Sequence, residues 1–96
     1  MNKITLFYLE DCPYCHNARR ALEELKMEDP KYGGIDVEWI EESRQRELAE
    51  QYDYYYVPTI FVGDQKLYEA SPSENYAKCK ENMKAALNTV LKSNPA

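Results

Sequence analysis

The hydrophobic period of the chain changes near residue 13. Residues 3–9 read Lys-Ile-Thr-Leu-Phe-Tyr-Leu, a short β-branched and aromatic run that stops before Asp11. Such a run predicts a central, buried strand. From Pro13 onward the apolar positions recur at steps of three or four, at Cys15, Ala18, Leu22 and Leu25. This spacing predicts an amphipathic helix of about 14 residues with charged side chains on its other face.

The middle of the chain combines a turn-rich stretch with shorter periodic segments. Residues 28–34 contain one proline and a glycine pair without any period, so we expect a loop that carries the chain to the far edge of a sheet. Residues 35–40 alternate apolar and polar positions and predict a second strand. Residues 43–51 are polar apart from Leu48 and Ala49, which suits a short surface helix.

The C-terminal part predicts a β-hairpin followed by a long helix. Residues 57–62 and 66–70 are strand-like and flank the turn signal Gly63-Asp64. Residues 71–74 read Ser-Pro-Ser-Glu, which places a capping hydroxyl before a proline and a glutamate and predicts a helix start. The buried stripe of this helix precedes the tail at Pro95 and consists of Tyr76, Cys79, Met83, Leu87, Val90 and Leu91.

These elements predict a single α/β domain over residues 1–96. Their order is strand, helix, strand, helix, strand, strand, helix, without an internal repeat. A strand–helix–strand crossover makes a right-handed parallel pair, whereas a hairpin adds antiparallel strands. We therefore expect a mixed four-stranded sheet flanked by three helices, with helices on both faces.

Composition narrows the function classes. The 96 residues include 12 Lys and Arg against 17 Asp and Glu, a net charge of −5, and basic residues never stand more than two together. This charge disfavours nucleic acid and anionic membranes as partners. The apolar runs are too short for a signal peptide or a membrane span. Three cysteines, an odd number, do not make the framework of a secreted disulfide scaffold, so we expect a reducing cytoplasm.

Cys12 and Cys15 lie where the first predicted strand gives way to the first predicted helix. If Cys12 is the N-cap, its sulfur faces the N–H groups of Tyr14 and Cys15, and the helix dipole adds positive potential. Both effects favour the thiolate, whereas the acidic neighbours Glu10 and Asp11 oppose it. Cys15 lies one turn further on, on the apolar face. We expect Cys12 to be the nucleophile of a thiol–disulfide exchange and Cys15 to resolve the mixed disulfide.

Two structural interpretations of the same cysteines are weaker. A disulfide between Cys12 and Cys15 closes only a short ring, which constrains the unfolded chain little, and a reducing compartment does not keep it closed. A zinc site would have to recruit His16 and Cys79, since the chain has no other histidine or cysteine. Cys79 suits a buried apolar position better, and His16 is expected on the solvent side of its helix. We expect no metal.

The tetrapeptide Cys12-Pro13-Tyr14-Cys15 is followed later in the chain by Val57-Pro58-Thr59, just before the third predicted strand. With these motifs and its order of elements, the sequence resembles the dithiol glutaredoxins of the thioredoxin-like superfamily over nearly its whole length. The resemblance implies a thioredoxin-like fold and a thiol–disulfide oxidoreductase that reduces protein or glutathione mixed disulfides. It also implies that Pro58 is cis beside the cysteines and that the Val57 backbone pairs with an extended substrate or glutathione. The substrate-binding positions implied are Pro13, Tyr14, Val57, Pro58, Thr59, Ser71 and Ser73.

Two departures from the glutaredoxins leave the electron donor open. Glutaredoxins commonly carry a lysine shortly before the first cysteine, where this chain has Leu9-Glu10-Asp11. They also usually have a Gly-Gly pair after the fourth strand, where this chain has Glu69-Ala70. Glu69 therefore brings a negative charge to the part of the site that binds the γ-glutamyl end of glutathione in that family. Glutathione, as a co-substrate, and a flavoprotein thioredoxin reductase are both candidate electron donors. We expect the protein to be a monomer without a tightly bound cofactor. The alternative functions are an iron–sulfur or metal carrier and a redox-regulated interaction module.

Residues 52–56 read Tyr-Asp-Tyr-Tyr-Tyr. With no basic groove beside them, they do not indicate a stacking platform for bases. We expect the rings to pack at the rim of the active-site cleft and the end of the sheet, with their hydroxyls in water and some of them touching a substrate polypeptide. Trp39 alternates with Val37 on the second predicted strand and is expected only to pack.

Overall fold

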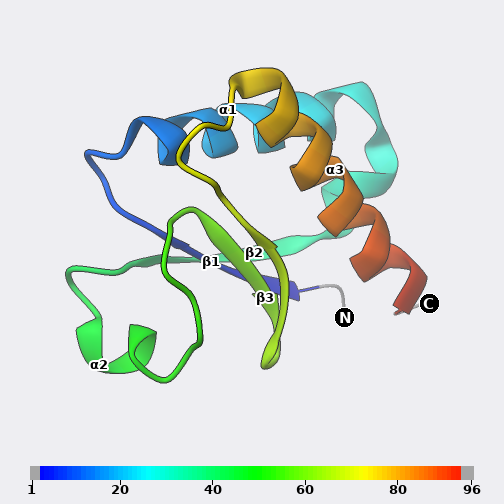
Figure 1. The fold of residues 1–96 in the computed structure, drawn as a ribbon. Coiled ribbons are helices and arrows are strands. Elements are labelled where there is room, and N and C mark those ends of the chain that lie inside the picture. Colours follow the sequence, from blue (N-terminus) through cyan, green and yellow to red (C-terminus); the bar gives the residue numbers. More distant parts are fainter. Residues whose placement is uncertain (1–2, 94–96) are drawn as a thin grey trace.

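The computed structural model describes residues 3–93, which contain one four-stranded sheet (Figure 1). Its strands are β1 (Lys3–Tyr8), β2 (Asp36–Glu41), β3 (Thr59–Val62) and β4 (Gln65–Glu69). Their order across the sheet is β2-β1-β3-β4. β1 and β2 are parallel, whereas β3 is antiparallel to both β1 and β4. The mixed four-stranded sheet predicted from the sequence is confirmed.

Three α-helices cover the two faces of this sheet. α1 (Pro13–Glu28) and α3 (Tyr76–Ser93) pack against each other over one face, and the short α2 (Arg46–Ala49) lies over the other (Figure 1). Helices on both faces were expected from the crossover and the hairpin. Among the helices of residues 3–93, none has the length and apolar character needed to cross a membrane.

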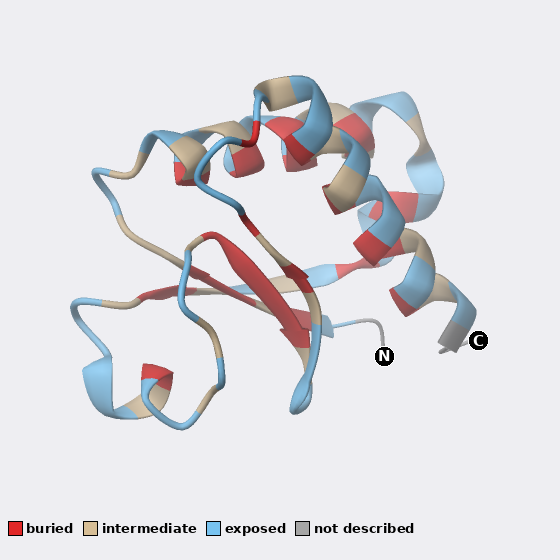
Figure 2. Ribbon diagram, in the orientation of Figure 1, coloured by how far each residue is buried: buried red, intermediate tan, exposed pale blue. Residues whose placement is uncertain are grey.

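Side-chain alternation along β1 feeds two hydrophobic cores. Ile4 and Leu6 are fully buried in the larger core beneath α1 and α3. Phe7 faces the opposite side, where it joins Ile40, Ala49 and Phe61. Figure 2 shows buried positions along the strands and on the inner sides of α1 and α3. Since each large buried apolar side chain contributes about 1.5–3 kcal/mol, β1 is anchored from both faces and gives the cysteines that follow it a rigid base.

The stretch predicted as a loop before β2 contains a 3₁₀-helix, η1 (Pro30–Gly34). The Asp29 side chain caps it by accepting the Lys31 N–H at 3.1 Å. Tyr32 turns inward, is only 1% exposed and donates its hydroxyl to Asn88 Oδ1 at 2.7 Å. This long-range contact closes the larger core and leaves no periodic trace in the sequence. β2 then lies at an edge of the sheet, as expected.

The two helices predicted to precede α3 differ from the structure at their ends. α1 has 16 residues and is slightly longer than its apolar stripe suggested. The helix predicted over residues 43–51 is limited to α2, four residues long. Its expected start is wrong because the Glu41 carboxylate accepts the N–H and the hydroxyl of Ser43, at 2.7 and 2.6 Å. These two bonds hold the chain in a turn before α2.

The last helix begins at Tyr76, five residues after the predicted cap at Ser71. Asn75 supplies the cap instead, since its Oδ1 accepts the Lys78 N–H at 2.8 Å. Glu74, predicted inside the first helical turn, points into the protein, where the Tyr68 hydroxyl donates to both of its carboxylate oxygens at 2.6 and 2.9 Å. A tertiary contact thus overrides the local capping signal. The tail at Pro95 lies outside the described residues.

Candidate active site

The two cysteines lie at the N-terminus of α1, as the sequence predicted. Cys12 is the N-cap residue, with φ −91° and ψ 119°, and Pro13 occupies the first helical turn. The Cys12 carbonyl accepts the N–H groups of Cys15 and His16, both at 3.1 Å. Cys12 is half-buried, whereas Cys15 is only 5% exposed. One thiol is therefore open to a substrate and the other lies one turn behind it.

The Cys12 sulfur does not cap the helix. Its side chain makes no capping hydrogen bond. The thiol instead points across to the loop before β3, where the Val57 carbonyl accepts it at 3.8 Å. The predicted approach of this sulfur to the N–H groups of Tyr14 and Cys15 is wrong, because the carbonyl of Cys12 takes up the Cys15 N–H. The positive end of the helix dipole still lies beside the sulfur.

Cys15 is held by the end of β1. The Leu9 N–H donates to Cys15 Sγ at 3.4 Å, and the Cys12 N–H donates to the Leu9 carbonyl at 3.2 Å. Burial raises the pKa of the Cys15 thiol to about 12; the Leu9 N–H opposes this rise and the adjacent Cys12 adds to it. Cys15 therefore keeps its proton at neutral pH until a reaction at Cys12 changes its surroundings.

The Val57–Pro58 peptide bond is cis, as the resemblance implied. Val57 is half-buried and Pro58 is buried, with the Pro58 carbonyl accepting the Ala70 N–H at 3.0 Å. Thr59 is fully buried at the start of β3, and its hydroxyl donates to the Tyr68 carbonyl at 2.7 Å. The structure thus brings Val57 to Cys12 but turns the Thr59 side chain into the sheet.

Ser71 and Ser73 lie exposed in the turn between β4 and α3. This turn is tied to the start of α1, because the Tyr14 hydroxyl donates to the Pro72 carbonyl. The half-buried Tyr14 ring therefore spans from the cysteine motif to the serine-containing turn. The predicted substrate-binding positions on α1 and on this turn lie beside each other, although far apart in sequence.

Glu69 has a role that sequence reasoning missed. Its carboxylate accepts the N–H groups of Tyr55 and Tyr56, at 2.6 and 2.8 Å, and pairs with Lys66 Nζ at 2.7 Å. Burial by itself raises the pKa of Glu69, but these donors outweigh it and hold the pKa below its ordinary value. The negative charge expected to face a ligand is therefore neutralised within the protein. The only sign of this role of Glu69 in the sequence is the position of an acidic residue two places before Ser71.

The tyrosine run divides into packed and exposed rings. Tyr52 and Tyr54 lie 4.7 and 5.1 Å from the Phe7 ring, centroid to centroid, which places them on the α2 face of the sheet. The Tyr54 hydroxyl donates to Glu42 Oε1 at 2.6 Å, so the prediction that the hydroxyls are wet is wrong for this residue. Tyr55 and Tyr56 are 87% and 52% exposed.

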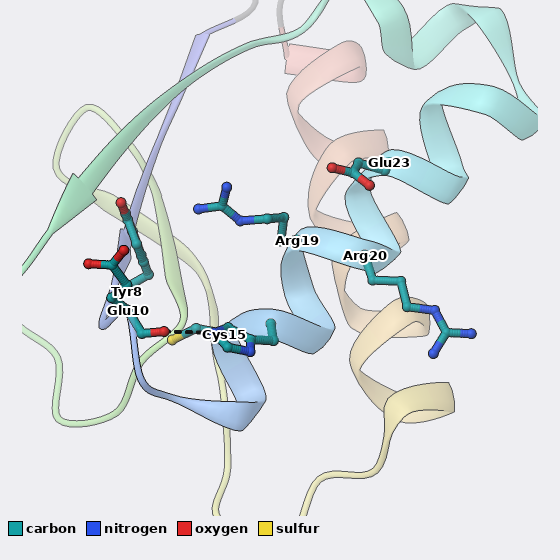
Figure 3. Close-up of a pocket in the computed structure, with 7 residues that line it drawn as sticks. Tyr8, Glu10, Cys15, Arg19, Arg20 and Glu23 are labelled. Atoms are coloured by element: carbon teal, nitrogen blue, oxygen red, sulfur yellow. Dashed lines mark hydrogen bonds between the residues drawn. The ribbon is translucent and has the colours of Figure 1, made fainter.

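A hollow of about 410 Å³ lies beside α1, and Cys15, His16 and Arg19 are among the residues that line it (Figure 3). His16 is exposed, but its Nε2 lies 2.6 Å from the Glu10 carbonyl and donates to it, so the side chain is tied to the loop. The Arg19 guanidinium lies over the Trp39 ring at 4.7 Å. Trp39 thus supports a cation as well as packing.

Similarity to known proteins shows which family this chain belongs to. Residues 4–67 match the family Glutaredoxin. A thioredoxin from Methanocaldococcus jannaschii is 32% identical over 72 residues, which cover 75% of this chain and 82% of that protein. The chain belongs to the glutaredoxin family. The resemblance inferred from the two motifs is confirmed, within the thioredoxin-like superfamily.

Solved structures confirm the thioredoxin-like fold of this glutaredoxin-family chain. NrdH-redoxin from Escherichia coli superposes with a TM-score of 0.54 at 23% identity, covering 98% of this chain and 97% of that one. Thioredoxin 1 from Thermosipho africanus gives a TM-score of 0.57 at 17% identity, with 91% and 96% covered. At these identities the likeness concerns the fold.

The acidic loop of this glutaredoxin-family chain is internally paired. Glu10 Oε2 accepts from Arg44 Nη2 at 2.9 Å, and the Glu10 N–H donates to Glu41 Oε2 at 3.2 Å. The Arg44 guanidinium is thus already engaged within the protein. Cys79 is 3% exposed beneath the Tyr68 hydroxyl, as expected for a small buried residue. Within residues 3–93, no three side chains of His, Cys, Asp or Glu gather as metal ligands.

Proposed function

We propose that this chain is a dithiol thiol–disulfide oxidoreductase in which Cys12 attacks and Cys15 resolves. One observation carries the proposal: a half-buried thiol faces the loop of a cis proline, while a second thiol lies shielded one turn behind it. An accessible thiol meets a substrate first, and a buried thiol reacts only within the protein. This arrangement separates the two steps of disulfide exchange.

The reaction proceeds through a mixed disulfide. The Cys12 thiolate attacks one sulfur of the substrate disulfide, that S–S bond breaks, and the other sulfur leaves as a thiolate that takes up a proton. Cys15 then loses its proton and attacks Cys12 Sγ, which releases the second substrate sulfur. The substrate gains two electrons and two protons, and a disulfide remains between Cys12 and Cys15.

Val57 supports binding of an extended polypeptide at this site. Its N–H has no hydrogen-bond acceptor among residues 3–93, and its carbonyl faces only the Cys12 thiol. A backbone N–H without a partner invites pairing with a substrate backbone. The substrates proposed are therefore disulfide-bonded proteins, in a reducing compartment such as the cytoplasm.

We further propose a flavoprotein thioredoxin reductase, rather than glutathione, as the electron donor. Two basic side chains that could otherwise meet a ligand carboxylate are occupied, since Arg44 pairs with Glu10 and Lys66 pairs with Glu69. Glutathione carries two carboxylates and needs free donors to bind them. Two similar proteins agree with this choice: one is named thioredoxin, and NrdH-redoxin is described as a glutaredoxin-like protein with a thioredoxin-like activity profile.

The donor is tested by reducing the oxidised protein in two parallel systems. One contains glutathione, glutathione reductase and NADPH; the other contains thioredoxin reductase and NADPH. We expect NADPH consumption and the appearance of two free thiols in the second system only. Cys79→Ala, which removes the cysteine remote from the motif, is the matched control and should behave like the wild type.

Three other outcomes are informative. Reduction by glutathione alone would reverse the choice of donor but leave the dithiol chemistry intact. Reduction by neither system would contradict the proposed function. Turnover that survives Cys12→Ser would contradict the assignment of the nucleophile.

A further inference from the structure

Tyr55 and Tyr56, here called the tyrosine pair, are exposed beside the candidate active site. Their side chains are 87% and 52% exposed. They directly precede Val57, whose carbonyl lies 3.8 Å from Cys12 Sγ. Tyr52 and Tyr54 in the same run pack on Phe7, so the exposed tyrosines of the run are the two that lie next to Val57 in the sequence. Exposed aromatic side chains at one place indicate a contact surface.

The backbone of the tyrosine pair is held in place although its side chains are in water. One oxygen of Glu69, Oε2, accepts both N–H groups at 2.6 and 2.8 Å. The other oxygen pairs with Lys66, whose Nζ also donates to the Asp53 carbonyl at 3.2 Å. The rings therefore extend from a fixed backbone, which lowers the entropy lost when a partner binds.

The pair lies within reach of a polypeptide that reacts at Cys12. Tyr56 and Tyr55 are one and two residues from Val57, and an extended chain covers about 3.3–3.6 Å per residue. A substrate that pairs along Val57 with its cysteine at Cys12 therefore brings a side chain two to four residues away from that cysteine over the tyrosine pair. A small disulfide does not extend that far.

We propose that the tyrosine pair docks an aromatic or long apolar side chain of the polypeptide substrate, next to its disulfide. Tyrosine rings supply a large contact area with little conformational entropy to lose. Glu69 is the positioning residue, because it holds both backbone N–H groups and touches no reacting atom. The inference rests on the proposed function and adds a preference for apolar sequence around the substrate cysteine.

Two synthetic peptides test this inference. Each contains one cysteine linked as a mixed disulfide to thionitrobenzoate, and they differ only in whether Phe or Ser stands three residues from the cysteine. Attack of Cys12 on the peptide sulfur releases the coloured thionitrobenzoate anion, and Cys15 then frees the peptide. The protein is supplied in its reduced form, and each molecule reacts once because no other reductant is present. The readout is the ratio of the second-order rate constant of thionitrobenzoate release with the Phe peptide to that with the Ser peptide.

We expect the wild-type protein to favour the Phe peptide about tenfold, the loss typical when an aromatic anchor is removed. Replacing both Tyr55 and Tyr56 by Ser should bring the ratio close to one, mainly through a loss of rate with the Phe peptide. Met27→Ser, which removes an 85% exposed apolar side chain from the far end of α1, should keep the wild-type ratio. Glu69→Gln should lower the ratio by raising the concentration of the Phe peptide at half-maximal rate, while the maximal rate of thionitrobenzoate release is retained.

A ratio near one in the wild type, or an unchanged ratio in the double variant, would overturn the docking role and leave the proposed function standing. Equal losses with both peptides in the double variant would also overturn it, because the tyrosines would then act on the reaction in general. If the wild type failed to react with either peptide, the proposed function and this inference would fall together.

Discussion

The Cys12 thiol and the Val57 carbonyl face each other at 3.8 Å, across 45 positions of sequence. This contact joins the N-terminus of α1, which follows β1, to the loop that leads into β3, and β1 and β3 are neighbours in one sheet. In the proposed reaction, a substrate bound to Cys12 therefore lies next to the Val57 backbone. The sheet thus holds the two segments of the candidate active site in a fixed relation to each other.

Alkylation tests the different accessibility of the three cysteines. Iodoacetamide at neutral pH is expected to modify Cys12 alone, because Cys15 and Cys79 are 5% and 3% exposed and burial raises the pKa of both thiols. Mass spectrometry should show one adduct on the folded protein and three after denaturation in urea. Prior modification of Cys15 or Cys79 in the folded protein would contradict the assigned burial.

The buried Tyr68–Glu74 contact should matter for stability. Tyr68→Phe removes the hydroxyl that donates to both oxygens of a carboxylate only 7% exposed, and should cost about 1.5–3 kcal/mol of unfolding free energy. Tyr32→Phe, which loses a neutral hydrogen bond to Asn88, should cost about 1 kcal/mol. Urea unfolding measures both. An equal cost for the two variants would show that Glu74 finds other donors.

Glu69 should make stability depend on pH in the acid range. Its donors hold its pKa in the folded protein below the ordinary value of 4.5, so the unfolded chain binds the proton first as the pH falls. The stabilisation is fully present above 4.5 and is lost as the pH falls through the lower, folded-state value. Glu69→Gln should be less stable at pH 7 and should lose less stability between about pH 5 and pH 3.

Glu81→Gln is the control for this pH dependence. Glu81 pairs with Lys78 at 3.9 Å, but its side chain is 73% exposed, and such surface pairs contribute little. Its unfolding curve from pH 7 to pH 3 should follow that of the wild type. If Glu69→Gln also followed the wild type, the bonds from Glu69 to the tyrosine loop would not stabilise the folded state.

Local patterns carried most of the fold prediction. The short apolar run that contains Ile4, Leu6 and Phe7 and the stripe from Cys15 to Leu25 report burial directly, so β1, α1 and the sheet could be predicted from the sequence. Pro13 and the cysteine spacing likewise placed Cys12 at a helix cap. These features depend on neighbours within one or two turns of the chain.

The contacts that sequence reasoning missed connect distant segments. Glu74 is recruited by Tyr68 and not by a helix cap, and Glu69 reaches back 13 and 14 residues to the tyrosine pair. Such pairings depend on how β4 is placed beside the loop before β3, which no local period reports. The same applies to Cys12 Sγ, which capping rules directed toward its own helix and the fold directs toward Val57.

The most direct test of the central claim is to trap the mixed disulfide. Cys15→Ser, incubated with a disulfide-bonded polypeptide such as insulin, should accumulate a covalent adduct at Cys12 that dithiothreitol releases, and mass spectrometry after proteolysis should locate the bond. Cys12→Ser should form no adduct, since the remaining thiol of the motif is buried. An adduct at Cys15 in the Cys12→Ser variant, or no adduct at Cys12 in the Cys15→Ser variant, would contradict the division of roles between the two cysteines.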